Sequence, residues 1–134
     1  MKMRFREALC LFAAGASGYC ALETLWRGRT HPSMALCGGV VLPAFVGLRR
    51  RLGSGLRLCL TGCGLITLCE LLCGLLCNRT HRVWDYSRRP GNLHGQICPL
   101  FSALWFLLCV VLDALCPLLE RHLSFLDKDP GGAL

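Results

Sequence analysis

The sequence predicts an all-α integral membrane protein, a four-helix bundle with a long polar and aromatic loop between its third and fourth helices. Of the 134 residues, 54% are hydrophobic and 17% are charged. The apolar residues form four blocks, at residues 8–26, 32–48, 55–77 and 97–119, and most charges lie between them. An apolar helix of about twenty residues crosses the roughly 30 Å of bilayer hydrocarbon. We therefore predict one helical domain over residues 1–126 and a disordered tail over residues 127–134.

The first block follows three basic residues, as the apolar core of a signal peptide does. A cleavage site near residue 15 is therefore one interpretation. The apolar pattern continues to Trp26, however, which favours an uncleaved first span. Within it, Ala14, Gly18 and Ala21 share one side with the spacing of close helix contacts, so Gly18 is predicted to pack against another helix.

The third block contains one charged residue, Glu70, between Arg57 and Arg79. A carboxylate inside a span is costly, so it marks a functional or strongly packed site. At about 100° per residue, most glycines and cysteines share one third of the helix with Glu70, and most leucines lie opposite. Since small residues let helices approach closely, Glu70 is predicted to face other helices, with Gly62 and Gly74 in the packing contacts. The residues predicted to face lipid are Leu58, Leu60, Leu65, Leu68, Leu71, Leu72, Leu75 and Leu76.

Two other acidic residues lie in apolar blocks. Glu23 is near the end of the first block, at the level of the membrane interface, where it is either an ordinary solvated carboxylate or a functional one. Asp113 lies about one turn before Pro117 and near the end of the fourth block, where a solvated carboxylate is the plainer interpretation.

Eleven cysteines lie almost entirely within the apolar blocks. None forms a C-x-x-C pair, so the usual zinc and thioredoxin spacings are missing. We interpret the cysteines as small apolar packing residues and expect neither a metal site nor a cofactor.

The net charge of +7 comes from fifteen lysines and arginines against eight acidic residues, and the arginines lie at the ends of the blocks, as in membrane proteins. No basic face is interleaved with stacking aromatics, so nucleic acid is not an expected partner. With four spans, the N-terminus, the second connection and the tail share one side of the membrane and hold nine of the fifteen lysines and arginines. The first and third connections share the other side and hold six. Because cytoplasmic loops carry the excess of positive charge, we predict a cell-membrane protein with both termini in the cytoplasm.

The connection over residues 78–96 is long, polar and aromatic. Trp84 and Tyr86 suit the headgroup level of a membrane. Asp85 lies between them, and two interpretations stay open: a plain amphipathic re-entry loop, or a carboxylate paired with a nearby arginine. The arginines within reach in the sequence are Arg82, Arg88 and Arg89.

A family resemblance begins in this connection. The residues that carry it are Trp84-Asp85-Tyr86-Ser87, Pro90, Asn92-Leu93, Gly95, Ile97-Cys98, Ser102 and Trp105. Together they resemble the signature of the Putative ABC-transporter type IV membrane proteins, small bacterial multi-pass proteins described as ABC-transporter permeases. Earlier residues match in order: Gly18, Glu23, Gly39, Pro43, Glu70 and Gly74. Val40 and Phe45 stand where the family pattern has a proline and a tyrosine.

The resemblance implies a membrane transport component. The sequence contains no G-x-x-x-x-G-K-[ST] loop, so ATP hydrolysis would have to come from a separate ATPase chain. Four helices leave little room for a pathway within one protomer, which favours a homodimer or assembly with other subunits in the lipid bilayer.

In a four-span topology the matched residues all lie in one half of the membrane. We hypothesise that Glu23, Glu70 and Asp85 line one binding site, with Arg82, Arg88 or Arg89 as counter-charges. The residues that complete the predicted binding set are Trp84, Tyr86, Asn92 and Trp105. A neutral Glu70 that takes part in proton coupling is an alternative, because a buried carboxylate charge is costly.

Two other functions compete with transport. A structural or regulatory subunit would dock a partner on the Trp-Asp-Tyr-Ser loop and use its acidic residues to lock helices together. A membrane enzyme acting on a lipid or quinone is disfavoured because no nucleophile and base set and no G-x-S-x-G elbow occurs. We therefore predict no catalytic residues, and we interpret His81 and His94 as solvated loop histidines.

Overall fold

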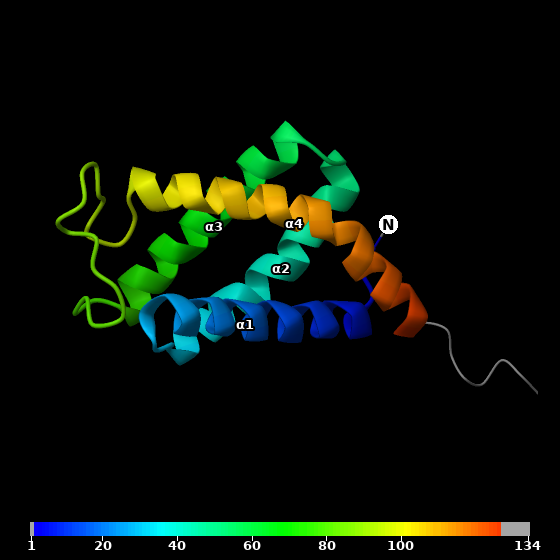
Figure 1. The fold of residues 1–134 in the computed structure, drawn as a ribbon, viewed down its shortest axis with the longest axis horizontal. Helices are drawn as coiled ribbons and strands as arrows, with labels where there is room; N and C mark the ends of the chain where they lie inside the picture. Colours follow the sequence, from blue (N-terminus) through cyan, green and yellow to red (C-terminus); the bar gives the residue numbers. More distant parts are fainter. Residues whose placement is uncertain (1, 127–134) are drawn as a thin grey trace, which may run out of the picture.

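The computed structural model describes residues 2–126. They form the helices α1 (Phe5–Arg27), α2 (Pro32–Leu52), α3 (Leu56–Cys77) and α4 (Pro99–Leu126). All four are long and apolar enough to cross a membrane, which confirms the predicted all-α membrane bundle. Figure 1 shows the connection between α3 and α4 at one end of the bundle and the α2–α3 turn at the other. The predicted disordered tail lies outside the described residues.

The α1–α2 and α2–α3 turns are short, and specific residues end or begin the helices there. Gly28 ends α1 with φ 72° and donates its N–H to the carbonyl oxygen of Thr24 at 2.8 Å. Pro32 begins α2, where its fixed φ and missing N–H suit a first helical turn. Such short connections make consecutive helices antiparallel neighbours. The end of α1 and the start of α2 therefore lie at the same face of the membrane as the end of α3.

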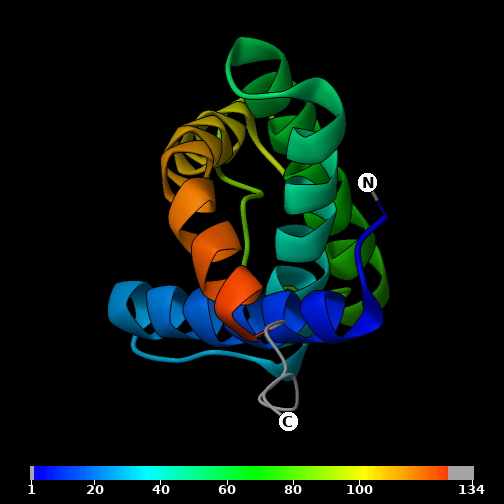
Figure 2. The same ribbon diagram turned by 90° about the vertical axis from the view of Figure 1, so that its right-hand side faces the viewer.

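Helix α1 crosses α2 (Figure 2), and a pair of glycines, Gly15 and Gly38, lies where they touch. A Cβ atom on Gly15 or on Gly38 would overlap the carbonyl oxygen of the other, so both positions need the bare backbone. The prediction for Gly18 is corrected: its Cβ position has no neighbour within 4 Å, and Ala14 and Ala21 are exposed. The physical reason is the rotation of α1 about its own axis: the side with Gly15 faces α2, and the side with Ala14, Gly18 and Ala21 faces outward.

Helices α2, α3 and α4 form most of the core. At Gly62, a Cβ atom would lie 2.7 Å from the ring of Phe45 and 2.9 Å from the sulfur of Cys109. The prediction that Leu58 faces lipid is wrong: it is fully buried, because both α2 and α4 cover the first turns of α3. The buried core residues are Leu11, Leu42, Phe45, Val46, Leu58, Cys59, Ile66, Trp105, Cys109 and Cys116.

Helix α4 bends towards the start of α1 in its last third (Figures 1 and 2). Pro117 lies in this part and cannot donate the N–H that would bond the carbonyl oxygen of Asp113. Beyond the bend, Glu120 pairs with two arginines: its Oε2 lies 3.5 Å from Arg49 and its Oε1 lies 3.3 Å from Arg50. Arg50 also pairs with Glu7, so these ion pairs join α1, α2 and α4. We call this end of the molecule the basic end.

Asp113 is not the solvated carboxylate that the sequence suggested. Its Oδ1 accepts a hydrogen bond from Arg49 at 2.9 Å. Its Oδ2 accepts from the hydroxyl of Ser54 at 2.6 Å and from the backbone N–H of Gly55 at 3.0 Å. Asp113 thus fixes the α2–α3 turn against α4.

Candidate functional site

Glu70 joins three elements of the structure. It lies in α3, and its side chain is buried. Its Oε1 accepts a hydrogen bond from the hydroxyl of Tyr86 in the loop at 2.9 Å. Its Oε2 accepts one from the indole Nε1 of Trp105 in α4, also at 2.9 Å. Both carboxyl oxygens are thus satisfied by neutral donors from the same chain.

Aromatic contacts hold these donors in place. The ring of Tyr86 stacks on that of Phe101, with centroids 4.4 Å apart. Trp105 packs against Tyr19 of α1 at 6.1 Å between centroids. Burial, and then the charge of Glu70, raise the pKa of Tyr86 well above its ordinary value, so its hydroxyl stays protonated and donates.

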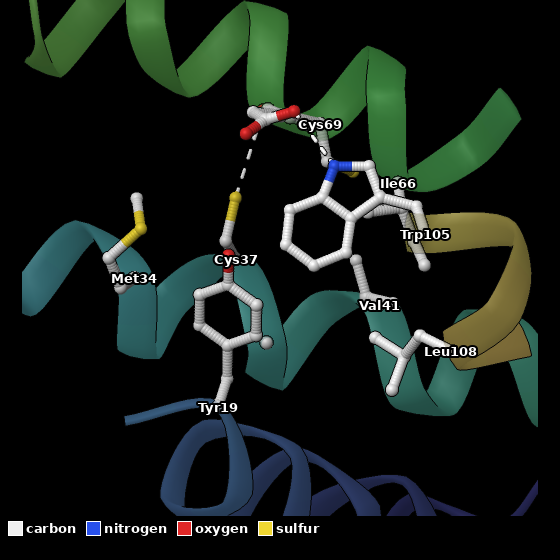
Figure 3. A pocket seen from close by; sticks show the side chains of 10 residues that line it. Tyr19, Met34, Cys37, Val41, Ile66, Cys69, Trp105 and Leu108 are labelled. Carbon is white, nitrogen blue, oxygen red and sulfur yellow. Dashed lines mark hydrogen bonds between the residues drawn. The ribbon is translucent and has the colours of Figure 1, made fainter. Parts of the chain in front are cut away.

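A small cavity of about 40 Å³ lies beside Glu70 where the four helices meet (Figure 3). Its wall includes Tyr19 from α1, Cys37 from α2, Cys69 from α3 and Trp105 from α4. The space is large enough for one or a few water molecules. Glu70 is therefore the acidic group of an internal space shared by the whole bundle.

The loop is fixed to the end of α3 by two buried amides, Asn78 and Gln96. Asn78 donates to the carbonyl oxygen of Trp84 at 2.7 Å and to Oε1 of Gln96 at 3.1 Å, and it accepts from the N–H of Val83 at 2.9 Å. Gln96 donates back to the carbonyl oxygen of Asn78 at 3.0 Å. A Cβ atom on Gly74 would overlap the Gln96 side chain, so this glycine makes room for the loop. We call this end of the molecule the loop end.

Glu23 lies at the same end but does not contact Glu70 directly. It is buried in α1 and pairs with Arg27 at 3.1 Å. Arg27 also donates to the carbonyl oxygen of Val83 at 2.7 Å, which ties α1 to the loop. Glu23 borders a groove of about 340 Å³ whose wall includes Tyr86 and Trp105, the two residues that bind Glu70.

The hypothesis that Asp85 shares a site with Glu70 is wrong. Asp85 is fully exposed and accepts a hydrogen bond from the backbone N–H of Ser87 at 2.9 Å. Its neighbours Trp84 and Tyr86 are buried, an alternation typical of an extended segment. The side chain of Asp85 is therefore directed away from the helices.

Three other predicted binding residues also lie elsewhere. Arg88 is exposed, and among residues 2–126 no ion pair forms between it and Asp85. The amide of Asn92 bonds backbone groups of the loop turn, with Arg89 at 2.9 Å and Gly95 at 3.0 Å. Trp84 donates its indole N–H to the carbonyl oxygen of Gln96 at 3.0 Å. Asn92 and Trp84 therefore shape the loop and do not line the cavity.

The sequence reasoning missed Asn78, Gln96 and Arg27. The two amides directly border the apolar blocks at either end of the loop, and this placement was the available signal. Arg27 follows Glu23 by four residues, which is ion-pair spacing on a helix.

Four membrane-crossing helices, a carboxylate held among them and an aromatic loop fixed over one end define a multi-pass helical membrane protein. The family described as Putative ABC-transporter type IV has a model that matches residues 11–132. The chain belongs to this family, which confirms the resemblance found in the sequence. No curated protein and no solved structure matches the chain.

Proposed function

We propose that this protein is a membrane-embedded, permease-like component of an ABC-type transport system in which another chain hydrolyses ATP. Its family and its four apolar helices support a transport role in a multi-pass membrane protein. The sequence lacks a P-loop, so the energy source would be a separate ATPase. In this proposal the chain itself performs no catalytic step.

The arrangement of Glu70 carries the proposal. A carboxyl group held inside a membrane bundle is costly, and such groups usually mark substrate, ion or proton pathways. Glu70 borders the internal cavity, and its two donors, Tyr86 and Trp105, border the groove that also contains Glu23. These contacts support a polar site confined to one half of the membrane.

The assembly and orientation belong to the same proposal. Four helices give little room for a pathway, so the protein works as a homodimer or with other membrane subunits. The excess of lysine and arginine at the basic end favours cytoplasmic termini in the cell membrane. The loop end and its polar site then lie in the outer half of the bilayer.

Purification from native membranes in mild detergent tests this proposal. We expect vanadate-sensitive ATP hydrolysis in the preparation, above that of a mock purification. Glu70→Gln should leave assembly intact but reduce this hydrolysis, whereas Glu120→Gln, the same change at the basic end, should retain it. A folded, monodisperse preparation without ATP hydrolysis would contradict the proposal.

A structural or regulatory subunit is the second candidate. It is favoured by one observation: both oxygens of Glu70 are already bonded within the chain. Tyr86→Phe separates the two functions, because it removes a donor and keeps the carboxyl group. If Tyr86→Phe and Glu70→Gln lower the thermal unfolding midpoint equally and leave ATP hydrolysis per folded protein unchanged, Glu70 only locks helices.

A further inference from the structure

Two hollows adjoin at the loop end, and their linings differ in chemistry. The groove of about 340 Å³ lies between the end of α1 and the first turns of α4. Its wall is mostly apolar, formed by Leu22, Leu25, Trp26, Phe101, Leu104 and Leu108. The second hollow, also about 340 Å³, is lined by residues of the α1–α2 turn, the end of α3 and the loop. Glu23 and Arg27 border both hollows, so the two are neighbours.

The second hollow is positively charged. Its wall contains three guanidinium groups, those of Arg27, Arg29 and Arg82, against the one carboxylate of Glu23. Arg27 is occupied by Glu23 and by the carbonyl oxygen of Val83. Arg29 and Arg82 are exposed, and within residues 2–126 neither makes an ion pair. Their charges are therefore available to an anion.

The combination matches an amphiphile with an anionic head. The residues of α4 that line the groove span Phe101 to Leu108, about 10 Å along the helix axis. Along α4 this wall runs from the loop end into the apolar span, whereas Arg29 and Arg82 lie in the α1–α2 turn and in the loop, outside the helices. Arginine binds phosphate oxygens with paired N–H donors, so these arginines suit a phosphate headgroup.

We propose that the two hollows together bind one anionic phospholipid, with an acyl chain in the groove and the phosphate against Arg29 and Arg82. A free phosphate compound would use only the second hollow and leave the apolar groove without a role. The Glu23–Arg27 pair lies where the two hollows meet. In it, Arg27 neutralises the carboxylate of Glu23, which would otherwise repel the phosphate. This site is independent of the proposed transport function, because it requires only the folded protein in a bilayer.

Tryptophan quenching by brominated lipid tests the site. The full chain is placed in phosphatidylcholine nanodiscs that contain brominated phosphatidylglycerol or, separately, brominated phosphatidylcholine. Trp26 and Trp105 line the groove and are the reporters, whereas Trp84 is a buried residue of the loop and lines neither hollow. We expect stronger quenching by the anionic lipid at equal mole fraction. Trp26→Phe should leave the part of the selective signal that comes from Trp105.

Arginine variants identify the headgroup contact. Arg29→Gln and Arg82→Gln should each lower the selectivity for phosphatidylglycerol about fivefold, the effect of one basic residue at a lipid headgroup. The control is Arg88→Gln with Arg89→Gln, which removes two charges from the same loop outside both hollows and should retain the selectivity. Because Arg29 and Arg82 are exposed and make no ion pair with any residue that the structure describes, these variants should fold, and an unchanged thermal midpoint checks this.

Each other outcome overturns the proposal. An equal loss of phosphatidylglycerol selectivity in the variant with both Arg88→Gln and Arg89→Gln would mean that diffuse surface charge attracts the lipid. Equal quenching by both lipids would mean ordinary contact with surrounding bilayer lipid. Relief of the selective quenching by millimolar glycerol phosphate would assign the second hollow to a soluble phosphate compound, since a bound phospholipid should resist this competitor.

Discussion

The two ends of the bundle fasten their helices by different chemistry. At the loop end, Asn78 and Gln96 are 1% and 2% exposed, and they bond mainly backbone groups and each other. At the basic end, the fastening consists of ion pairs whose side chains are more open to solvent, such as Arg49 at 20% and Glu120 at 32% exposed. The contact between α3 and the loop thus relies on buried neutral hydrogen bonds, with the Glu23–Arg27 pair tying α1 to the loop, and the basic end relies on partly solvated charges.

This difference predicts how each end fails. A buried polar group left without its partner costs its full desolvation, so single changes at the loop end should be severe. Partly exposed ion pairs contribute little individually and weaken as salt rises. The rigid loop end is also where Glu70, the cavity and the groove lie. The Glu70 site therefore lies beside the buried hydrogen bonds of Asn78 and Gln96, which change least with salt concentration.

The largest effect is expected for Asn78→Ala. The change removes three hydrogen bonds and leaves buried groups of Val83, Trp84 and Gln96 without partners. We expect a loss of about 3 kcal/mol in the free energy of unfolding. Thermal unfolding in detergent measures this loss, and faster tryptic cleavage in the loop would show that it has come loose.

Asn92→Ala is the matched control for Asn78→Ala. Asn92 also makes three hydrogen bonds, all to backbone groups of the same loop. Those to Ser87 and Arg89 are exposed, so water replaces these partners, and only the bond from Gly95 is part-buried. Its expected cost is about 1 kcal/mol. Equal costs for the two variants would refute the claim that burial makes the loop end costly to break.

Gly74→Ala should have the next largest effect. Its new methyl group would overlap the side chain of Gln96, which is held in place by Asn78. We expect a loss of about 2 kcal/mol from this overpacking. Gly64→Ala in the same helix meets nothing within 4 Å and should gain up to about 1 kcal/mol from helix propensity. A similar gain in stability for both variants, in chemical or thermal unfolding, would show that the Gln96 side chain moves aside at little cost.

The inward orientation of Glu70 could be predicted because it depends on one helix alone. Regular rotation of about 100° per residue placed Glu70 with the glycines and cysteines. The resemblance added Tyr86 and Trp105 to the predicted site. Both are hydrogen-bonded to Glu70 in the structure, although their functional role stays a prediction.

Other features depend on contacts between distant segments and could not be predicted in this way. Gly15 and Gly18 are equally small, and only the rotation of α1 against α2 decides which one packs. The outward direction of Asp85 depends on a loop conformation fixed by Asn78 and Gln96. Arg49 and Asp113 are 64 residues apart, and their pairing requires the packed positions of α2 and α4.

Arg50→Gln tests the basic end. Arg50 pairs with Glu7 and with Glu120, so its loss should cost about 1 kcal/mol at low salt. In about 1 M salt, where the Debye length is roughly 3 Å, most of this cost should disappear. The cost of Asn78→Ala should stay the same under both conditions. Arg51→Gln is the neighbouring control, because Arg51 is exposed and makes no ion pair among the described residues.

The smallest effect is expected for Asp85→Asn, the carboxylate on the outer surface of the loop end. The side chain and then the backbone N–H of Ser87 lower the pKa of Asp85 below its ordinary value of 3.8. Because the folded pKa is lower than the unfolded one, the carboxylate stabilises the fold above the unfolded pKa, and this stabilisation is lost as the pH falls through the folded pKa. The wild type should therefore unfold at a slightly higher temperature than Asp85→Asn at pH 7, and the difference should vanish as the pH falls below the lowered pKa of Asp85. A difference that persists in acid would mean that Asp85 stabilises the loop through its shape or a partner and not through its charge.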